Sequence, residues 1–197
     1  YSDVTALLLW QRRCAGLMGF HGPMLDRGDD VAADALASLV AQLGGRGRPV
    51  AAFAGQGHGG GRATGRLAGG SLTMIAASIG TPWEIDTRRV ILMLEDTGER
   101  PYRIDRMLQQ LSGAGKLAQV AGVGLGDFES CVDDRFPDRP VLAVILEVLR
   151  PLGVPVVTGL SFGHVRANYP WPEGARATID GDSGELRVIE QGVESPS

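Results

Sequence analysis

The chain has 197 residues, of which 44% are hydrophobic and 21% are charged, with a formal net charge of -4 at pH 7. This is the composition of a globular domain and excludes wholesale disorder, and an acidic chain with scattered basic residues argues against a nucleic-acid partner. Its 29 glycines are about twice the usual share and follow no G-X-Y period, so they predict turns and close backbone approaches rather than collagen.

The N-terminal third predicts two helices and a glycine-rich segment. Apolar residues are so dense over residues 3–15 that we expect a buried helix there. Asp29 or Asp30 can cap a second helix that ends at Gly44. Because residues 44–70 hold so much glycine, they predict a strand, a loop and a second short strand.

From residue 71 onward, helical and strand patterns alternate. Ser71 is a candidate N-cap for a helix to residue 79, and a continuous apolar run over residues 90–94 is typical of a strand buried on both faces. Helices are then expected over residues 102–112 and 141–149, strands over 120–125 and 154–157, and a final hairpin from 177–179 and 186–189. The pattern predicts an α/β fold, a mostly parallel sheet with flanking helices plus a C-terminal β-hairpin.

Several ligand sites and locations are disfavoured. Residues 55–60 match G-x-G-x-x-G, but more glycine follows where a dinucleotide loop needs a helix. The three histidines lack a second ligand at metal spacing, so we expect no metal. Cys14 and Cys131 have no CxxC partner, which indicates free thiols of a reducing compartment. The apolar run over residues 5–10 is too short for a bilayer, so a cytoplasmic protein without membrane contact is expected.

Three residues could meet at one edge of the predicted sheet. Ser2 stands at a turn directly before a helix, Glu95 follows the strand over residues 90–94, and His164 follows the strand over residues 154–157. Ligands bind beyond the carboxyl ends of parallel strands, and a serine nucleophile needs an imidazole base oriented by a carboxylate. The residues alone leave a helix cap, a solvated acid and a loop histidine as alternatives, and a G-x-S-x-G elbow is absent.

Several segments resemble the LD-carboxypeptidase family of serine peptidases, which includes murein tetrapeptide carboxypeptidases and microcin C immunity proteins. The resemblance covers nearly the whole chain, and the segments that carry it are YSDVTAL at 1–7, HGP at 21–23, GRLAGGSL at 65–72, LEDTGE at 94–99, PYRIDR at 101–106 and GLSFGH at 159–164. The chain departs from the family at Ser71, where asparagine is usual. It also lacks the long segment that precedes the nucleophile in the family and helps to form the oxyanion hole.

The resemblance implies a role for each matched residue. Ser2 would be the nucleophile, His164 the base and Glu95 the acid that orients it, with Glu99 as the rival for the acid role. The backbone N–H of Asp3 would contribute an oxyanion donor.

The implied reaction is hydrolysis of the amide bond between an L-centre and a terminal D-alanine of a muropeptide, as in peptidoglycan recycling, without a cofactor. Gly70 and Ser71, at a helix N-terminus, would seat the terminal carboxylate of the substrate. Two alternatives stay open: a microcin C-type hydrolase of peptidyl-nucleotides and a non-catalytic ligand-binding α/β module.

The expected organisation is that of a two-domain peptidase of which this chain is one piece. Residues 1–45 would be the remainder of a domain that bears the nucleophile, residues 46–70 a glycine-rich linker, and residues 71–197 the domain that carries the acid and the histidine. An N-terminal segment of the same protein is therefore an expected partner, because a parallel sheet left uncovered would expose apolar surface. The sequence leaves the oligomeric state open, a homodimer included.

Overall fold

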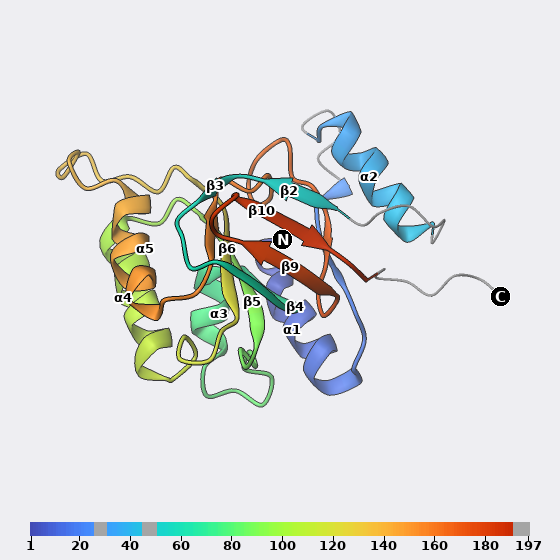
Figure 1. Cartoon of the computed structure of the whole chain (residues 1–197), viewed down its shortest axis with the longest axis horizontal. Helices are drawn as coiled ribbons and strands as arrows, with labels where there is room; N and C mark the ends of the chain where they lie inside the picture. The colour runs from blue at the N-terminus through green and yellow to red at the C-terminus, as the bar shows by residue number, and fades with distance from the viewer. Residues whose placement is uncertain (26–30, 45–50, 191–197) are drawn as a thin grey trace.

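An eight-stranded sheet forms the centre of the protein (Figure 1). The computed structural model describes residues 1–25, 31–44 and 51–190. Across the sheet the strands are β2 (Ala52–Ala54), β10 (Glu185–Val188), β9 (Arg176–Asp180), β4 (Arg62–Ser71), β5 (Val90–Thr97), β6 (Gly122–Glu129), β7 (Val156–Thr158) and β3 (Gln56–Gly57). The four strands from β4 to β7 are parallel and the outer pairings are antiparallel. The predicted fold class is therefore confirmed.

Helices cover one face of this sheet. The helices are α1 (Val4–Trp10), α2 (Ala33–Leu43), α3 (Leu72–Ser78), α4 (Pro101–Gly113) and α5 (Val141–Leu149), with a π-helical turn η1 (Gln11–Ala15) after α1 and a 3₁₀ turn η3 (Arg150–Leu152) after α5. A separate ladder pairs β1 (Phe20–His21) with β8 (Trp171–Pro172). Helix α2 stands apart from the layer formed by α3, α4 and α5 (Figure 1).

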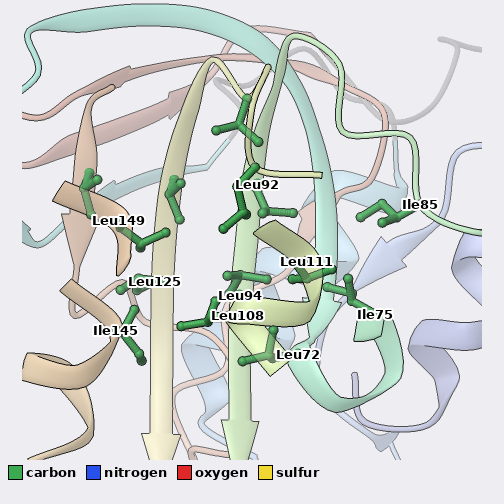
Figure 2. Packing of buried hydrophobic residues seen from close by; sticks show 14 of the residues in the cluster. Leu72, Ile75, Ile85, Leu92, Leu94, Leu108, Leu111, Leu125, Ile145 and Leu149 are labelled. Atoms are coloured by element: carbon green, nitrogen blue, oxygen red, sulfur yellow. The ribbon is translucent and has the colours of Figure 1, made fainter. Parts of the chain in front are cut away.

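The alternation of side chains along β5 divides the core into two clusters. Leu92 and Leu94 join the cluster under the helices, where they pack with residues such as Leu108 and Leu111 of α4 (Figure 2). Met93 belongs to the cluster on the opposite face, and all these side chains are fully buried. Successive residues of a strand point to opposite faces, so Glu95 projects with Met93, away from the helices.

Most predicted elements are present, with two corrections near the N-terminus. The helix expected over residues 3–15 is α1 followed by the π-helical turn, which ends at Gly16 with a φ of 66°. It is not buried all round, since Val4, Leu7 and Trp10 are 43%, 52% and 47% exposed. Its apolar density exceeds what the sheet can cover, because one stripe of a helix faces one neighbour.

The glycine-rich segment is the second correction. Its described part is mostly strand, with β2 and β3 at the two edges of the sheet and β4 ten residues long near its centre. Residues 51–70 are thus part of the sheet rather than a linker. Residues 55–60 lead into β4 and not into a helix, so they lack the geometry of a dinucleotide loop.

Some boundaries predicted from the sequence lie outside the described residues. This holds for the cap at Asp29 or Asp30 and for the division between residues 45 and 46. The predicted hairpin is present as β9 and β10. Ser71 caps α3 as expected, because its Oγ accepts a hydrogen bond from the Met74 N–H at 3.3 Å.

Candidate active site

A buried carboxylate and an imidazole meet at the carboxyl end of β5. Nδ1 of His164 donates to Oε2 of Glu95 at 2.8 Å, and the Glu95 side chain is fully buried. Gly163 permits this approach: its φ is +115°, and an added Cβ would lie 3.0 Å from Cβ of Glu95. A glycine is needed here because L side chains rarely adopt such a φ.

The loop that carries His164 is fixed to the neighbouring strand by its backbone. The Leu160 N–H donates to Leu125 O at 3.0 Å, and the Asp127 N–H donates to Phe162 O at 2.9 Å. The Gly163 N–H donates to Oδ1 of the buried Asn168 at 3.1 Å. The histidine therefore projects from a held loop and not from a free one.

Ser2 has the backbone of a strained turn at the start of α1. Its φ is 58°, a left-handed conformation that is uncommon for a residue other than glycine. A nucleophile on a sharp turn before a helix exposes its hydroxyl in this way. The ring of Tyr1 stands edge-on to the ring of His164, with centroids 4.5 Å apart. Among the described side chains, Ser2 and His164 do not share a hydrogen bond, and such bonds often tighten only when substrate binds.

The first turn of α1 is seated on the end of β4. Oγ1 of the buried Thr5 accepts a hydrogen bond from the Ser71 N–H at 3.1 Å. A Cβ on Gly70, whose φ is +134°, would lie 2.5 Å from that oxygen. Gly70 and Ser71 thus hold the turn that carries Ser2 and Asp3.

The N-terminus of α3 already has internal partners. Besides the Ser71 cap, the Thr73 N–H and hydroxyl both donate to Oδ2 of Asp96 at 2.8 Å. The role of Gly70 and Ser71 toward a substrate carboxylate remains a prediction, as does the oxyanion role of the Asp3 N–H. Asp3 occupies the N-cap position of α1, directly after Ser2.

The two neighbouring acids of β5 have opposite electrostatic environments. Burial alone would raise the pKa of Glu95, but its hydrogen bond with His164 and its close contact with His21 outweigh burial and lower the pKa to about 2. Burial raises the pKa of Asp96, and its bonds to Thr73 oppose this only in part. Glu95 is therefore the ionised acid beside His164.

Glu99, the alternative to Glu95 as the orienting acid, has a different partner. Glu99 precedes α4 and forms an ion pair with Nε of Arg103 at 2.9 Å. Within the described ranges, the carboxylate bonded to His164 is that of Glu95. The geometry favours Glu95 over Glu99 as the orienting acid.

Sequence reasoning assigned no role to a second histidine at this site. Nε2 of His21 lies 3.5 Å from Oε1 of Glu95, and both side chains are fully buried. The HGP segment is part of the family resemblance. However, the strand that contains His21 has only two residues, which is too short for a side-chain alternation that would indicate its partner strand. The partner, β8, is far along the chain and pairs His21 with Trp171.

A small cavity opens beside His164. It has a volume of about 210 Å³, and Tyr1, Met24, His164 and Arg166 are among its lining residues. A larger cavity of about 650 Å³, between α4 and the loop before α5, includes neither Glu95 nor His164. The small cavity is the better candidate for substrate because His164 lines it.

Metal sites, membrane spans and reactive thiols each have requirements that can be compared with the described ranges. They contain no group of three or more His, Cys, Asp or Glu placed to hold a metal, and none of their helices combines the length and apolarity needed to cross a bilayer. Both cysteines are free, as expected. Burial raises the pKa of Cys131 to about 11, so its thiol stays protonated at neutral pH.

Comparison with known proteins agrees with this geometry. Residues 64–179, more than half of the chain, match the LD-carboxypeptidase C-terminal domain. The chain belongs to the LD-carboxypeptidase family. A Synechocystis protein named as a carboxypeptidase is 42% identical over 190 residues, covering 96% of this chain and 62% of that protein. The chain therefore spans less than two thirds of the length of this relative.

Solved structures of family members have the same fold. Muramoyltetrapeptide carboxypeptidase from Oxalobacter formigenes superposes with a TM-score of 0.84 at 32% identity, covering 96% of this chain and 67% of that one. The microcin C7 self-immunity protein MccF, in complex with aspartyl sulfamoyl adenosine, gives a TM-score of 0.86 at 23% identity over 98% of this chain and 67% of that one. At that identity the second likeness concerns the fold alone.

Proposed function

We propose that this LD-carboxypeptidase chain carries the catalytic groups of a serine carboxypeptidase that removes terminal D-alanine from muropeptides. The observation that carries the proposal is the hydrogen bond between Glu95 and His164, next to the left-handed turn at Ser2. The name of the Oxalobacter relative supports a muropeptide as substrate. Peptidoglycan recycling is the process that such a reaction serves. We also propose a cytoplasmic location, which two free thiols suit.

In the proposed mechanism His164 is the base. Its Nδ1–H is engaged by Glu95, which leaves the lone pair of Nε2 to accept the Ser2 hydroxyl proton. The Ser2 oxygen attacks the carbonyl, and the Asp3 N–H donates to the oxyanion. His164 then returns the proton to the leaving amine of D-alanine, and a water molecule, activated in the same way, hydrolyses the acyl-enzyme.

The terminal carboxylate of the substrate needs a positive or dipolar seat. Arg166 lines the cavity beside His164 and can supply a cation there. The N–H groups near Gly70 and Ser71 are the other candidate, although several already have partners. We favour Arg166, because its guanidinium is exposed and has no side-chain hydrogen bond to another described residue, so it can bind a carboxylate without breaking an internal hydrogen bond.

The test is release of D-alanine from a D-alanine-terminated muropeptide, measured on this chain and on the protein translated from the whole gene. We expect release that resists a chelator and disappears in Ser2→Ala, with Ser183→Ala as a control on an exposed turn. Release that stops with chelator, or that continues in Ser2→Ala, would contradict the serine mechanism. A non-catalytic module is the alternative, and no release from the whole-gene protein would select it. Faster hydrolysis of a peptidyl-nucleotide would select the microcin-type activity.

A further inference from the structure

A second imidazole approaches Glu95 from the side opposite His164. Oε2 of Glu95 is bonded to His164, and its other oxygen, Oε1, lies 3.5 Å from Nε2 of His21. The His21 side chain has no exposed surface. Glu95 thus stands between two histidine rings that come from distant parts of the chain.

Aromatic rings hold His21 in place. Its ring stacks on Trp171, with centroids 4.9 Å apart and planes 13° from parallel, and meets the edge of Phe162 at 5.7 Å. The pairing of His21 with Trp171 in the β1–β8 ladder fixes the backbone as well. The ring contacts and the backbone pairing therefore hold the imidazole in one position, facing Glu95.

The polar atoms at this contact have no other partners in the described part of the chain. Both ring nitrogens of His21 and Oε1 of Glu95 are buried without a hydrogen bond at standard geometry. Buried polar atoms are costly unless they pair, and Nε2 and Oε1 face each other just beyond ideal hydrogen-bond length. A small rotation of either side chain joins them.

We propose that His21 is a positioning residue that donates from Nε2 to Oε1 of Glu95 and so fixes the carboxylate for His164. This inference rests on the proposed function. His21 is neutral in this role, because burial lowers its pKa and the pull of Glu95 opposes burial only in part. With a donor on each oxygen, the carboxylate is held ionised and in one orientation.

Loss of His21 would change the hydrogen bond between Glu95 and His164. Without the Nε2–H donor, Oε1 of Glu95 faces no donor, so the carboxylate can turn away from Nδ1 of His164. Other groups act on Glu95 as well: Asp96 of β5, Asp127 of β6 and the α-amino group of Tyr1 in this chain. These groups remain in the chain when His21 is replaced, so a change at His164 reports the loss of the imidazole.

The experiment is histidine-selective NMR spectroscopy at one fixed pH, which is tractable because the chain has three histidines. In the wild-type protein we expect the Nε2–H tautomer for His21 and the Nδ1–H tautomer for His164. His21→Phe should remove the dominance of the Nδ1–H tautomer of His164, whereas His21→Gln, which keeps a donor at similar reach, should preserve it. His58→Gln is the control, since His58 pairs with Thr158 instead.

Turnover provides the second readout. His21→Phe should lower kcat for D-alanine release about tenfold with little change in KM, and His21→Gln should restore most of it. An Nδ1–H tautomer of His21, or an unchanged His164 tautomer in folded His21→Phe, would overturn the proposal. If His21→Phe does not fold, the wild-type tautomer of His21 decides. A wild-type protein that shows both expected tautomers but releases no D-alanine would refute the proposed function and leave the His21–Glu95 contact standing.

Discussion

Two buried glutamates, Glu95 and Glu173, differ in whether the protein provides partners for a carboxylate that is removed from water. Both are almost completely buried. Glu95 has a histidine at each oxygen and a pKa lowered to about 2, with those contacts outweighing burial. Neither carboxylate oxygen of Glu173 has a hydrogen bond among the described residues, and burial raises its pKa to about 8, with Arg12 opposing weakly.

The difference shows where the fold supplies partners for a charge. A buried carboxylate costs free energy unless it is paired or protonated. At the carboxyl end of β5 the loop of His164 and the β1–β8 ladder both contribute imidazoles, so the charge is kept. Glu173 lies beside the π-helical turn after α1, near the start of β5, and is protonated at neutral pH. The two histidine contacts therefore distinguish Glu95, the candidate catalytic acid, from Glu173, which lowers the stability of the protein when it is ionised.

The largest expected effect comes from removing the charge of Glu95. Glu95→Gln should reduce kcat/KM for D-alanine release by about 10³-fold or more, because the amide no longer selects the His164 tautomer. Glu173→Gln, the matched change at the other buried acid, should leave the rate within about twofold at neutral pH. Steady-state kinetics measures both rates. Equal losses of kcat/KM in the two variants would show that the histidine contacts do not give Glu95 a role that Glu173 lacks.

The next effect concerns the glycine that lets His164 approach. Gly163→Ala should lower kcat/KM about 100-fold, since the new methyl group pushes against Glu95 and shifts the loop. Gly159→Ala in the same loop is the control, because its φ is also positive, +72°, but an added Cβ meets nothing within 4 Å. If both variants lose activity alike, backbone strain and not the Glu95 contact is responsible.

Glu173 should affect stability rather than rate. Its folded-state pKa lies above the unfolded value, so stability is full below about pH 4.5 and falls as pH rises toward 8. Glu173→Gln should therefore raise the free energy of unfolding by about 4 kcal/mol more at pH 9 than at pH 5. For Glu95 the sign is reversed: its contribution is present above its unfolded pKa and is lost as pH falls toward 2.

Urea unfolding at the two pH values measures this difference. Glu185→Gln, which replaces an exposed acid paired with Arg187, is the control and should show no such pH dependence. A gain from Glu173→Gln that is the same at pH 5 and pH 9 would mean that the carboxyl group is not protonated by burial.

The smallest effect is expected at the cavity beside His164. Arg166→Gln should raise KM about tenfold with kcat nearly unchanged, because about 1.4 kcal/mol of carboxylate binding is lost. Arg187→Gln removes a cation from β10 and should leave KM unchanged. An unaltered KM in Arg166→Gln would move the carboxylate seat back toward Gly70 and Ser71.

Much of the fold could be predicted from the sequence because its parallel strands and helices have strong local patterns. The continuous apolar run of β5 and the helical spacing of α4 are examples. The exposure of α1 could not be predicted, because the density of apolar residues does not reveal how much of a helix the sheet covers. Glu173 follows Trp171 and Pro172 in what looks like an exposed turn, and nothing local indicates its burial.

The site was predictable to the extent that it follows strand ends. Glu95 and His164 are expected together because parallel strands of one sheet end at the same edge, and the structure joins them by a hydrogen bond although β6 lies between their strands. His21 could not be placed, because it depends on a long-range pairing of two-residue strands. The roles of Ser2 and Asp3 remain predictions that rest on a turn and not on a contact with His164.

The most direct test of the account is the mass of the protein during turnover. Rapid quenching with a D-alanine-terminated muropeptide, followed by peptide mass analysis, should show the muropeptide acyl group on Ser2, with one D-alanine released for each adduct. The adduct should be absent in Ser2→Ala and strongly reduced in His164→Ala. D-alanine release with no adduct on Ser2, or at an unchanged rate in Ser2→Ala, would contradict the claim that Ser2, His164 and Glu95 act together.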